Sequence, residues 1–379
     1  MTESIGRRSA IWLWIETTRW TAVAPVVWIP KTAWSLNPTT ESANDDSGYG
    51  VIDEIYDSYT TKNRSWITLW WKVKHDSIGY LLKLALWSYT KLKVFTWTPS
   101  GWTPKRWDTV TGGTLRKILK IGSTTYYCFD WTVTAWTITN WTWTMSATAV
   151  NSFTVHMFSR LNNNTHPSAT IADVDPTSAS YAPFCMINSF ELSCAVADYM
   201  NFSAEFQWKQ MQSYASGSEP TPAYSDEPAF TASMAWVRFA SDESGLNTAS
   251  EVCMQNFRVS INKNLTDVQC FWSTDIEAIY NQQFGVEGDF EALFDDTALR
   301  DMALNSQKKA VRFYAEDWTV WNDFSAIYVD LMKVWLNDWT KTDSNNEIVR
   351  QTMWFTGQYS NSDGATIEIV LINGNSTGY

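Results

Sequence analysis

The chain has 379 residues, of which 45% are hydrophobic and 18% are charged, a balance typical of a globular protein large enough for two or three domains. Its 40 acidic and 28 basic residues give a formal net charge of −12, which argues against binding to the phosphate backbone of nucleic acid. An acidic surface stays compatible with a channel along which DNA slides, because like charges repel each other.

The first twenty residues contain a short apolar run, IWLWI, that Glu16 and Arg19 bring to an end. This run is too short for the core of a signal peptide or for a membrane span, so we expect a soluble protein with no cleaved signal and no membrane partner. The five cysteines form no CxxC pair and show no metal-ligand spacing. We therefore expect reduced, buried thiols in a cytoplasmic product.

Alternation of apolar and polar residues dominates the chain and predicts half-buried strands. Helical periodicity is convincing in two places only, at 77–86 and at 290–304, and Asp295 and Asp296 are candidate N-terminal caps of the second helix. The expected fold class is mainly β with two short helices. The clearest strand patterns lie at 65–69, 126–138, 201–206, 257–261 and 366–371.

The two predicted helices each follow a similar strand, at 67–73 and at 284–290, with a separation of 217 residues (284 minus 67). Segment 31–38 also matches 255–262, and segment 189–209 matches 333–358. Four matches in the same order indicate a tandem duplication, and chance similarity between β proteins is the alternative.

This repeat predicts the domain organisation. Residues 25–210 form domain one and 250–379 form domain two; residues 1–24 are an N-terminal arm and 211–249 a linker, rich in Ser, Pro and Glu at 213–228. Residues 96–148 have no counterpart in domain two. We expect them to form a small inserted β module displayed on the outside.

The chain has 24 tryptophans and only 16 glycines, and many tryptophans occupy positions that favour glycine. Trp87 ends a predicted helix, and a bulky residue with positive φ costs about 1–2 kcal/mol. We hypothesise that some of these tryptophans are encoded by UGA codons that the native host reads as glycine. A genuine Trp-rich surface is the alternative, and the codons in the gene would distinguish the two. Similar positions are Trp131, Trp141 and Trp318 in turns, Trp12, Trp14 and Trp20 near the N-terminus, and Trp272.

No catalytic, cofactor or metal site is predicted. The histidines His75, His156 and His166 lie in no HExxH motif, and neither a GxSxG elbow nor a phosphate-binding glycine loop is present. Acidic pairs and abundant aromatic residues leave one alternative open, a carbohydrate-binding β-sandwich or a glycosidase.

Several segments resemble the tail tube protein family of long-tailed bacteriophages. They are IWLWIETTRWTAVAPVVWIPKTA at 11–33, SGYGVIDEIYDSYTT at 47–61, the strand and helix at 65–88, LNNNTHPSAT at 161–170, the residues 188–206 and 271–290, and the residues 348–364, which include QTMWFTGQYSNSDG. Trp70-Trp71 depart from a Glu-Gly pair of the family that Glu287-Gly288 keep. The resemblance covers most of the chain except 96–148.

The resemblance implies tandem β-sandwich or barrel domains whose strands join neighbouring copies into a barrel around a lumen. The resemblance further implies that the rings stack and that DNA passes through them at ejection without specific binding. Two domains in one chain imply a trimeric ring with pseudo-sixfold symmetry, a hexameric ring being the alternative. The implied partners are further copies, the tape measure protein and the terminator, in a virion tail assembled in the bacterial cytoplasm. A tail terminator or baseplate ring protein is a further alternative.

Two sets of acidic residues are candidate assembly sites. The loop 39–59 is acidic, and we expect it to be flexible and to become ordered against the next ring. Its candidate residues are Glu41, Asp45, Asp46, Asp53 and Glu54, and Glu287 and Asp289 are candidates for the lumen.

Overall fold

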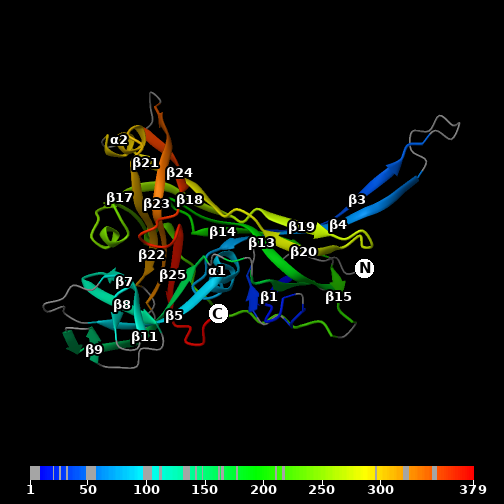
Figure 1. Cartoon of the computed structure of the whole chain (residues 1–379), viewed down its shortest axis with the longest axis horizontal. Helices are drawn as coiled ribbons and strands as arrows, with labels where there is room; N and C mark the ends of the chain where they lie inside the picture. The colour runs from blue at the N-terminus through cyan, green and yellow to red at the C-terminus, as the bar shows by residue number, and fades with distance from the viewer. Residues whose placement is uncertain are drawn as a thin grey trace.

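The computed structural model describes the whole chain except residues 1–8, 20, 25–26, 31–32, 48–56, 97–104, 111–112, 131–136, 141–142, 147, 161–162, 164–165, 176–177, 210, 216–217, 295–296, 319–323 and 344–347. The fold is mainly β with two short α-helices, as predicted, and its named strands pair antiparallel. Figure 1 shows a body of packed sheets from which one long hairpin projects.

An eight-stranded sheet runs through the molecule and is here called the long sheet. Its order follows from the strand pairs β3–β4, β4–β14, β14–β13, β13–β18, β18–β21, β21–β24 and β24–β23. The strands are β3 (Ala33–Asp45), β4 (Asp57–Lys72), β14 (Asn201–Trp208), β13 (Ala179–Ala195), β18 (Met254–Asn262), β21 (Gly285–Leu293), β24 (Arg350–Gly357) and β23 (Ser325–Thr342).

The first four strands of the long sheet are arranged like the last four. In the first quartet Trp71 faces Phe202, which faces Leu192; in the second quartet Gly288 faces Phe355, which faces Leu336. Trp71 and Gly288 are 217 residues apart (288 minus 71), the separation expected from the sequence. The predicted match of 31–38 with 255–262 is shifted by three residues. Trp34 faces Leu69, and Ile261 faces Val286, the residue equivalent to Leu69, so the structure aligns position 34 with 261 and not with 258.

A second sheet covers one face of the long sheet, and its order is β17-β16-β22-β23-β25-β11-β5-β8-β7-β6. The first half of β23 belongs to this sheet and its second half to the long sheet. The other strands are β17 (Glu251–Val252), β16 (Ala235–Ala240), β22 (Lys308–Asp317), β25 (Ile367–Asn373), β11 (Thr148–Ser159), β5 (Ser88–Thr96), β8 (Thr124–Asp130), β7 (Gly113–Ile121) and β6 (Thr109–Val110).

The main hydrophobic core lies between these two sheets. Leu69, Phe190 and Val259 of the long sheet share it with Phe313 and Ile369 of the second sheet. The core also takes in α1 (Ile78–Leu86), whose apolar face is buried, and part of α2 (Ala298–Leu304). Alternation in the strands therefore leaves the opposite face of the long sheet polar.

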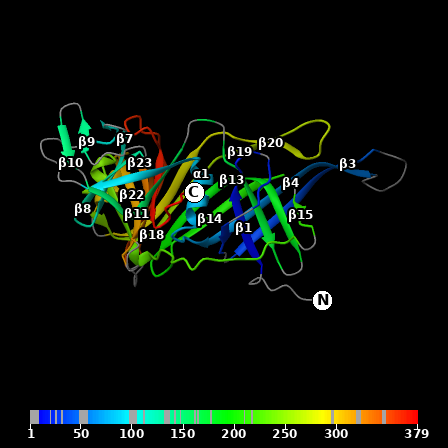
Figure 2. The ribbon, with the colours of Figure 1, turned by 90° about the horizontal axis from the view of Figure 1, so that it is seen from below.

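The remaining strands form smaller pieces. The first half of β13 pairs with β12, which pairs with β1, so the expected N-terminal arm in fact contributes a strand: Ile11 and Leu13 are fully buried. Figure 2 shows β1 on the side of the body near β15. The strands are β1 (Ala10–Ile15), β2 (Val27–Ile29), β12 (Ala169–Val174), β15 (Gln212–Ser213), β9 (Thr137–Asn140), β10 (Trp143–Ser146), β19 (Leu265–Gln269) and β20 (Ile276–Asn281); η2 (Ala232–Met234) and η3 (Ser244–Asn247) are 3₁₀ turns.

Three further expectations are corrected by the structure. The second helix begins at Ala298, because residues up to Leu293 continue the alternation of β21; its expected caps at 295 and 296 lie outside the described residues. The expected linker 211–249 contributes β16 to the second sheet. The insertion 96–148 is joined to the body, since β8 pairs with β5 and places Leu115 and Phe129 in a buried cluster.

Candidate assembly surfaces

The polar face of the long sheet carries two of the candidate assembly residues. Glu287 and Asp289, both lumen candidates, lie on this face beside Ser260 and Arg258 of the neighbouring strand. Glu191 and Glu205 come to the same face from β13 and β14. We call this surface the polar face; its charged members are Lys72, Glu191, Glu205, Arg258, Glu287, Asp289, Glu291, Asp338 and Arg350.

Ion pairs neutralise part of this face. Arg258 Nη2 lies 2.6 Å from Asp289 Oδ1, and Arg258 Nη1 lies 3.5 Å from Glu191 Oε2. Burial alone would lower the pKa of Arg258, but the hydrogen bond and the attraction to Asp289 outweigh it and raise that pKa. Arg350 lies 2.9 Å from Glu291. Glu287 is exposed and has no ion pair among the described residues, so the face keeps an acidic excess.

Both ends of the long sheet are open edges. Within the described part of the chain, β3 pairs along its length with β4 only. At the other end, β22 covers β23 as far as Trp335, and β24 occupies the opposite side of Leu336 to Thr342. One side of Leu336–Thr342 therefore has no partner strand among the described residues. Open edges of this length invite pairing with another strand.

The candidate loop 39–59 is largely a hairpin. Glu41 and Asp45 lie within β3, Asp46 follows its end, and Asp53 and Glu54 lie outside the described residues. Glu41 pairs with Arg64 of β4 at 3.0 Å. This hairpin extends far from the body in Figure 1. Sequence reasoning missed it because both faces of β3 are solvent-exposed here, so no apolar alternation marks the strand.

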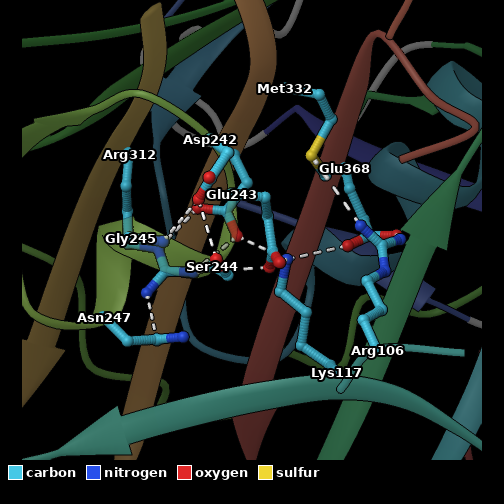
Figure 3. Close-up of polar contacts among 11 residues, drawn as sticks. Arg106, Lys117, Asp242, Glu243, Ser244, Gly245, Asn247, Arg312, Met332 and Glu368 are labelled. Atoms are coloured by element: carbon cyan, nitrogen blue, oxygen red, sulfur yellow. Dashed lines mark hydrogen bonds and ion pairs between the residues drawn. The ribbon is translucent and has the colours of Figure 1, made fainter. Parts of the chain in front are cut away.

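The densest group of ionisable side chains is buried, not exposed. Lys117 Nζ lies 2.6 Å from Asp330 Oδ2, 2.7 Å from Glu243 Oε1 and 2.8 Å from Glu368 Oε2. Arg312 pairs with Asp330 at 2.6 Å, and Figure 3 shows Arg106 reaching Glu368 from the other side, also at 2.6 Å. We call these six residues the buried ion cluster.

The buried ion cluster holds three cations against three carboxylates. Burial alone would lower the pKa of Lys117, but attraction to Asp330, Glu243 and Glu368 outweighs it and raises that pKa. Burial alone would raise the pKa of Asp330, but Arg312 and Lys117 lower it. Lys117 and Asp330 therefore stay charged, and Lys117, fully buried, is neither a free nucleophile nor a base. The cluster ties β7 of the insertion to β23 and β25.

The three histidines are also buried. Burial lowers the pKa of His156 to about 4, and its ring lies 2.9 Å from Tyr89 Oη and 3.0 Å from Asn373 Oδ1. His166 packs against Trp87 and Lys263. Across the described ranges, no group of three or more His, Cys, Asp or Glu side chains is placed to hold a metal ion.

The five thiols differ in their exposure. The expectation of buried thiols is met by Cys128, Cys185 and Cys194, but Cys253 is exposed and Cys270 half-buried. No described helix has the length and apolar character needed to cross a membrane.

Comparison with known proteins identifies the family. A search of curated proteins found no match. A family model described as phage tail tube protein matches residues 97–315, more than half of the chain. The match includes nearly all of the insertion, which the sequence motifs had left out, and the whole pairing of β13 with β18 at the centre of the long sheet. The chain therefore belongs to the phage tail tube protein family.

Proposed function

We propose that this chain assembles with copies of itself into rings, that the rings stack into the tail tube of a virion, and that DNA passes through the tube at ejection. The observation that carries the proposal is the long sheet, with its repeated quartets and its two open edges. A sheet of this kind removes its edges when copies close into a ring. The role is structural and not enzymatic.

The strand pairing that joins the two quartets inside the chain, here called the joint, serves as a template for the strand pairing between chains. Within the chain, β13 pairs with β18 from Ser189–Asn262 to Ala195–Asn256, which joins the first quartet to the second. By the repeat, β23 corresponds to β13, and β3 corresponds to β18. The open edge of β23 at Leu336–Thr342 of one copy would then pair with the open edge near the start of β3 in the next.

This joint sets the number of copies in the ring. We infer that each quartet is one unit of a duplication, within the boundaries 25–210 and 250–379. A ring of six such units needs three chains and has pseudo-sixfold symmetry; a hexamer of chains, with twelve units, is the alternative. The rotation that relates the two quartets within one chain then repeats around the ring.

The proposed lumen is lined by the polar face. Its acidic excess, with Glu287 unpaired among the described residues, would repel the DNA backbone and allow it to slide without binding. The β3–β4 hairpin, with Glu41, Asp45 and Asp46, would reach the next ring. A tape measure protein inside the tube and a terminator at its end are the expected partners, with assembly in the bacterial cytoplasm.

Electron microscopy of the purified protein tests the proposal. Stacked rings with a channel are expected, and native mass spectrometry should give three chains per ring. Isolated rings that never stack would favour a terminator or baseplate ring. Folded monomers that bind a glycan would favour the carbohydrate-binding alternative.

A matched pair of proline variants tests the edge. Thr340→Pro places a residue without an N–H on the open segment of β23, and we expect folded monomers without rings. Thr221→Pro makes the same change in an exposed coil and should leave the rings intact. Rings formed equally by both variants would overturn the proposed joint.

A further inference from the structure

Two arms extend from the same end of the long sheet. The first arm is the outer part of the β3–β4 hairpin, and the second is the β19–β20 hairpin, inserted between β18 and β21. Large apolar side chains are exposed on both: Tyr59 is 67% exposed, Trp272 84%, and Phe271 fully exposed. An isolated exposed aromatic residue needs no explanation, but three gathered where the tip of the second arm meets the first arm indicate a contact surface.

The second arm is held in place by the first. Lys62 Nζ lies 2.5 Å from Asp267 Oδ2, and Arg64 lies 3.5 Å from the same oxygen. Asn63 donates a hydrogen bond of 3.0 Å to Asp275, and Gln269 donates one of 2.6 Å to the Thr61 carbonyl. These bonds lie on both sides of Phe271 in the chain, so they fix where it is presented. Figure 1 shows β19 and β20 lying along the base of the hairpin.

A small pocket whose lining residues are mainly apolar lies at the opposite end of the same strands. The pocket has a volume of about 60 Å³, which admits the edge of an aromatic ring but not a whole one, since a cavity that holds benzene measures about 150 Å³. Val196 beside it is 56% exposed. The lining includes Val196, Trp236, Val252, Met254, Phe257 and Phe313.

The strand register places the arms and the pocket at opposite ends. In the β13–β18 pair, Asn262 leads toward the second arm, whereas Ala195 and Asn256 border the pocket. An aromatic projection at one end and an apolar pocket at the other are complementary surfaces on different parts of one chain. Such a heterologous contact leaves one surface of each copy free for a further copy, and where the copies stack without closing a ring it propagates along an axis.

We propose that the aromatic tip of the second arm, Phe271 with Trp272, docks against the Val196–Met254 pocket of a second copy in the neighbouring ring. The proposal rests on the proposed function and identifies the surface through which rings stack head to tail. The contact is distinct from the edge joint, which closes each ring. Apolar burial drives it, so it should hold at high salt, unlike contacts between exposed charges.

Two native cysteines allow a direct test. Cys270 precedes Phe271, and the exposed Cys253 lies between Val252 and Met254 of the pocket. A short bismaleimide added to assembled wild-type tubes should link Cys270 of one copy to Cys253 of the next, giving a ladder of covalent multimers on a denaturing gel. Cys253→Ser and Cys270→Ser should each abolish the ladder. Dimers that persist in either variant would indicate a symmetric contact and overturn the proposal.

A second pair of variants separates stacking from ring formation. Phe271→Ser is expected to form rings that do not stack, whereas Tyr280→Ser, a control on the same hairpin with 46% exposure, should stack normally. Phe271→Ser rings that stack like wild type would overturn this interface while leaving the proposed function intact. Wild-type protein that forms no ring at all would overturn the proposed function itself.

Discussion

Positive φ angles at tryptophan bear on the unusual composition. Trp87 and Trp107 have φ of 69° and 71°, and Trp87 is the helix-end position where the sequence favoured glycine. Trp12 and Trp14 were also predicted to occupy positions that favour glycine, but they lie in β1, so the backbone there gives no reason to prefer glycine. The indole N–H groups of Trp71 and Trp87 are buried without a hydrogen-bond partner in the described chain, which is uncommon for buried tryptophan.

At Trp107 we expect a glycine variant to be more stable than an alanine variant, the reverse of the usual order. It occupies the third position of a turn in which the Asp108 N–H donates to the Lys105 carbonyl, a place that favours glycine. We expect Trp107→Gly to be more stable than Trp107→Ala by about 1 kcal/mol in urea unfolding. At Trp70, equally exposed at 42% but in a strand, the alanine variant should be the more stable. The same order at both positions would contradict a strained Trp107.

In the Glu287-Gly288 pair, the close packing around position 288 requires a glycine. A Cβ there would lie 2.1 Å from the Arg258 carbonyl oxygen and 2.5 Å from the Phe355 ring. We expect Gly288→Ala to lower the free energy of unfolding by about 1–3 kcal/mol. Gly285→Ala, at the start of the same strand with open space around it, should change it little. Equal stability of the two variants in urea unfolding would contradict this packing.

At the level of elements, the buried ion cluster explains how the insertion is held. Lys117 comes from β7. Its carboxylate partners are Glu243, just before η3, Asp330 of β23 and Glu368 of β25. These partners lie 126 to 251 residues further along the chain (243 minus 117 and 368 minus 117). No sequence pattern announces such a cluster, because its members are scattered and each lies in an unremarkable context. A polar cluster of this kind specifies which strands meet more than it adds stability.

Lys117→Met tests this clamp. Removing the lysine leaves Asp330, Glu243 and Glu368 buried with one cation fewer, and we expect a loss of about 3–5 kcal/mol in the free energy of unfolding. Lys120→Met changes an exposed lysine of the same strand and should cost little. Thermal unfolding followed by circular dichroism compares the two. A Lys117→Met protein as stable as wild type would show that the cluster does not hold the insertion.

Sequence reasoning predicted the fold class, four of the five strand segments with clear alternation and the position of the first helix, because burial on one face leaves a period that can be counted. In the fifth segment, 126–138, β8 ends at Asp130 and β9 begins at Thr137, and residues 131–136 lie outside the described residues. It also predicted the family. It missed the hairpin arm, the strand in 1–24 and the strand β16, since these depend on partners far away in the chain. The open edge at 336–342 could not be predicted either, because it follows from where β22 ends along β23.

For the molecule as a whole, the acidic polar face leads to a prediction about DNA. Glu287 is exposed and unpaired among the described residues, so Glu287→Lys should fold normally and place one new cation per chain inside the ring. We expect the assembled variant to retain duplex DNA in a gel-shift assay at 50 mM salt and to release it toward 200 mM, as phosphate contacts do. Glu277→Lys, on the exposed side of β20 in the second arm, should not retain DNA. If both variants behave alike, the polar face does not line the channel, and the ring must close with its other surface inward.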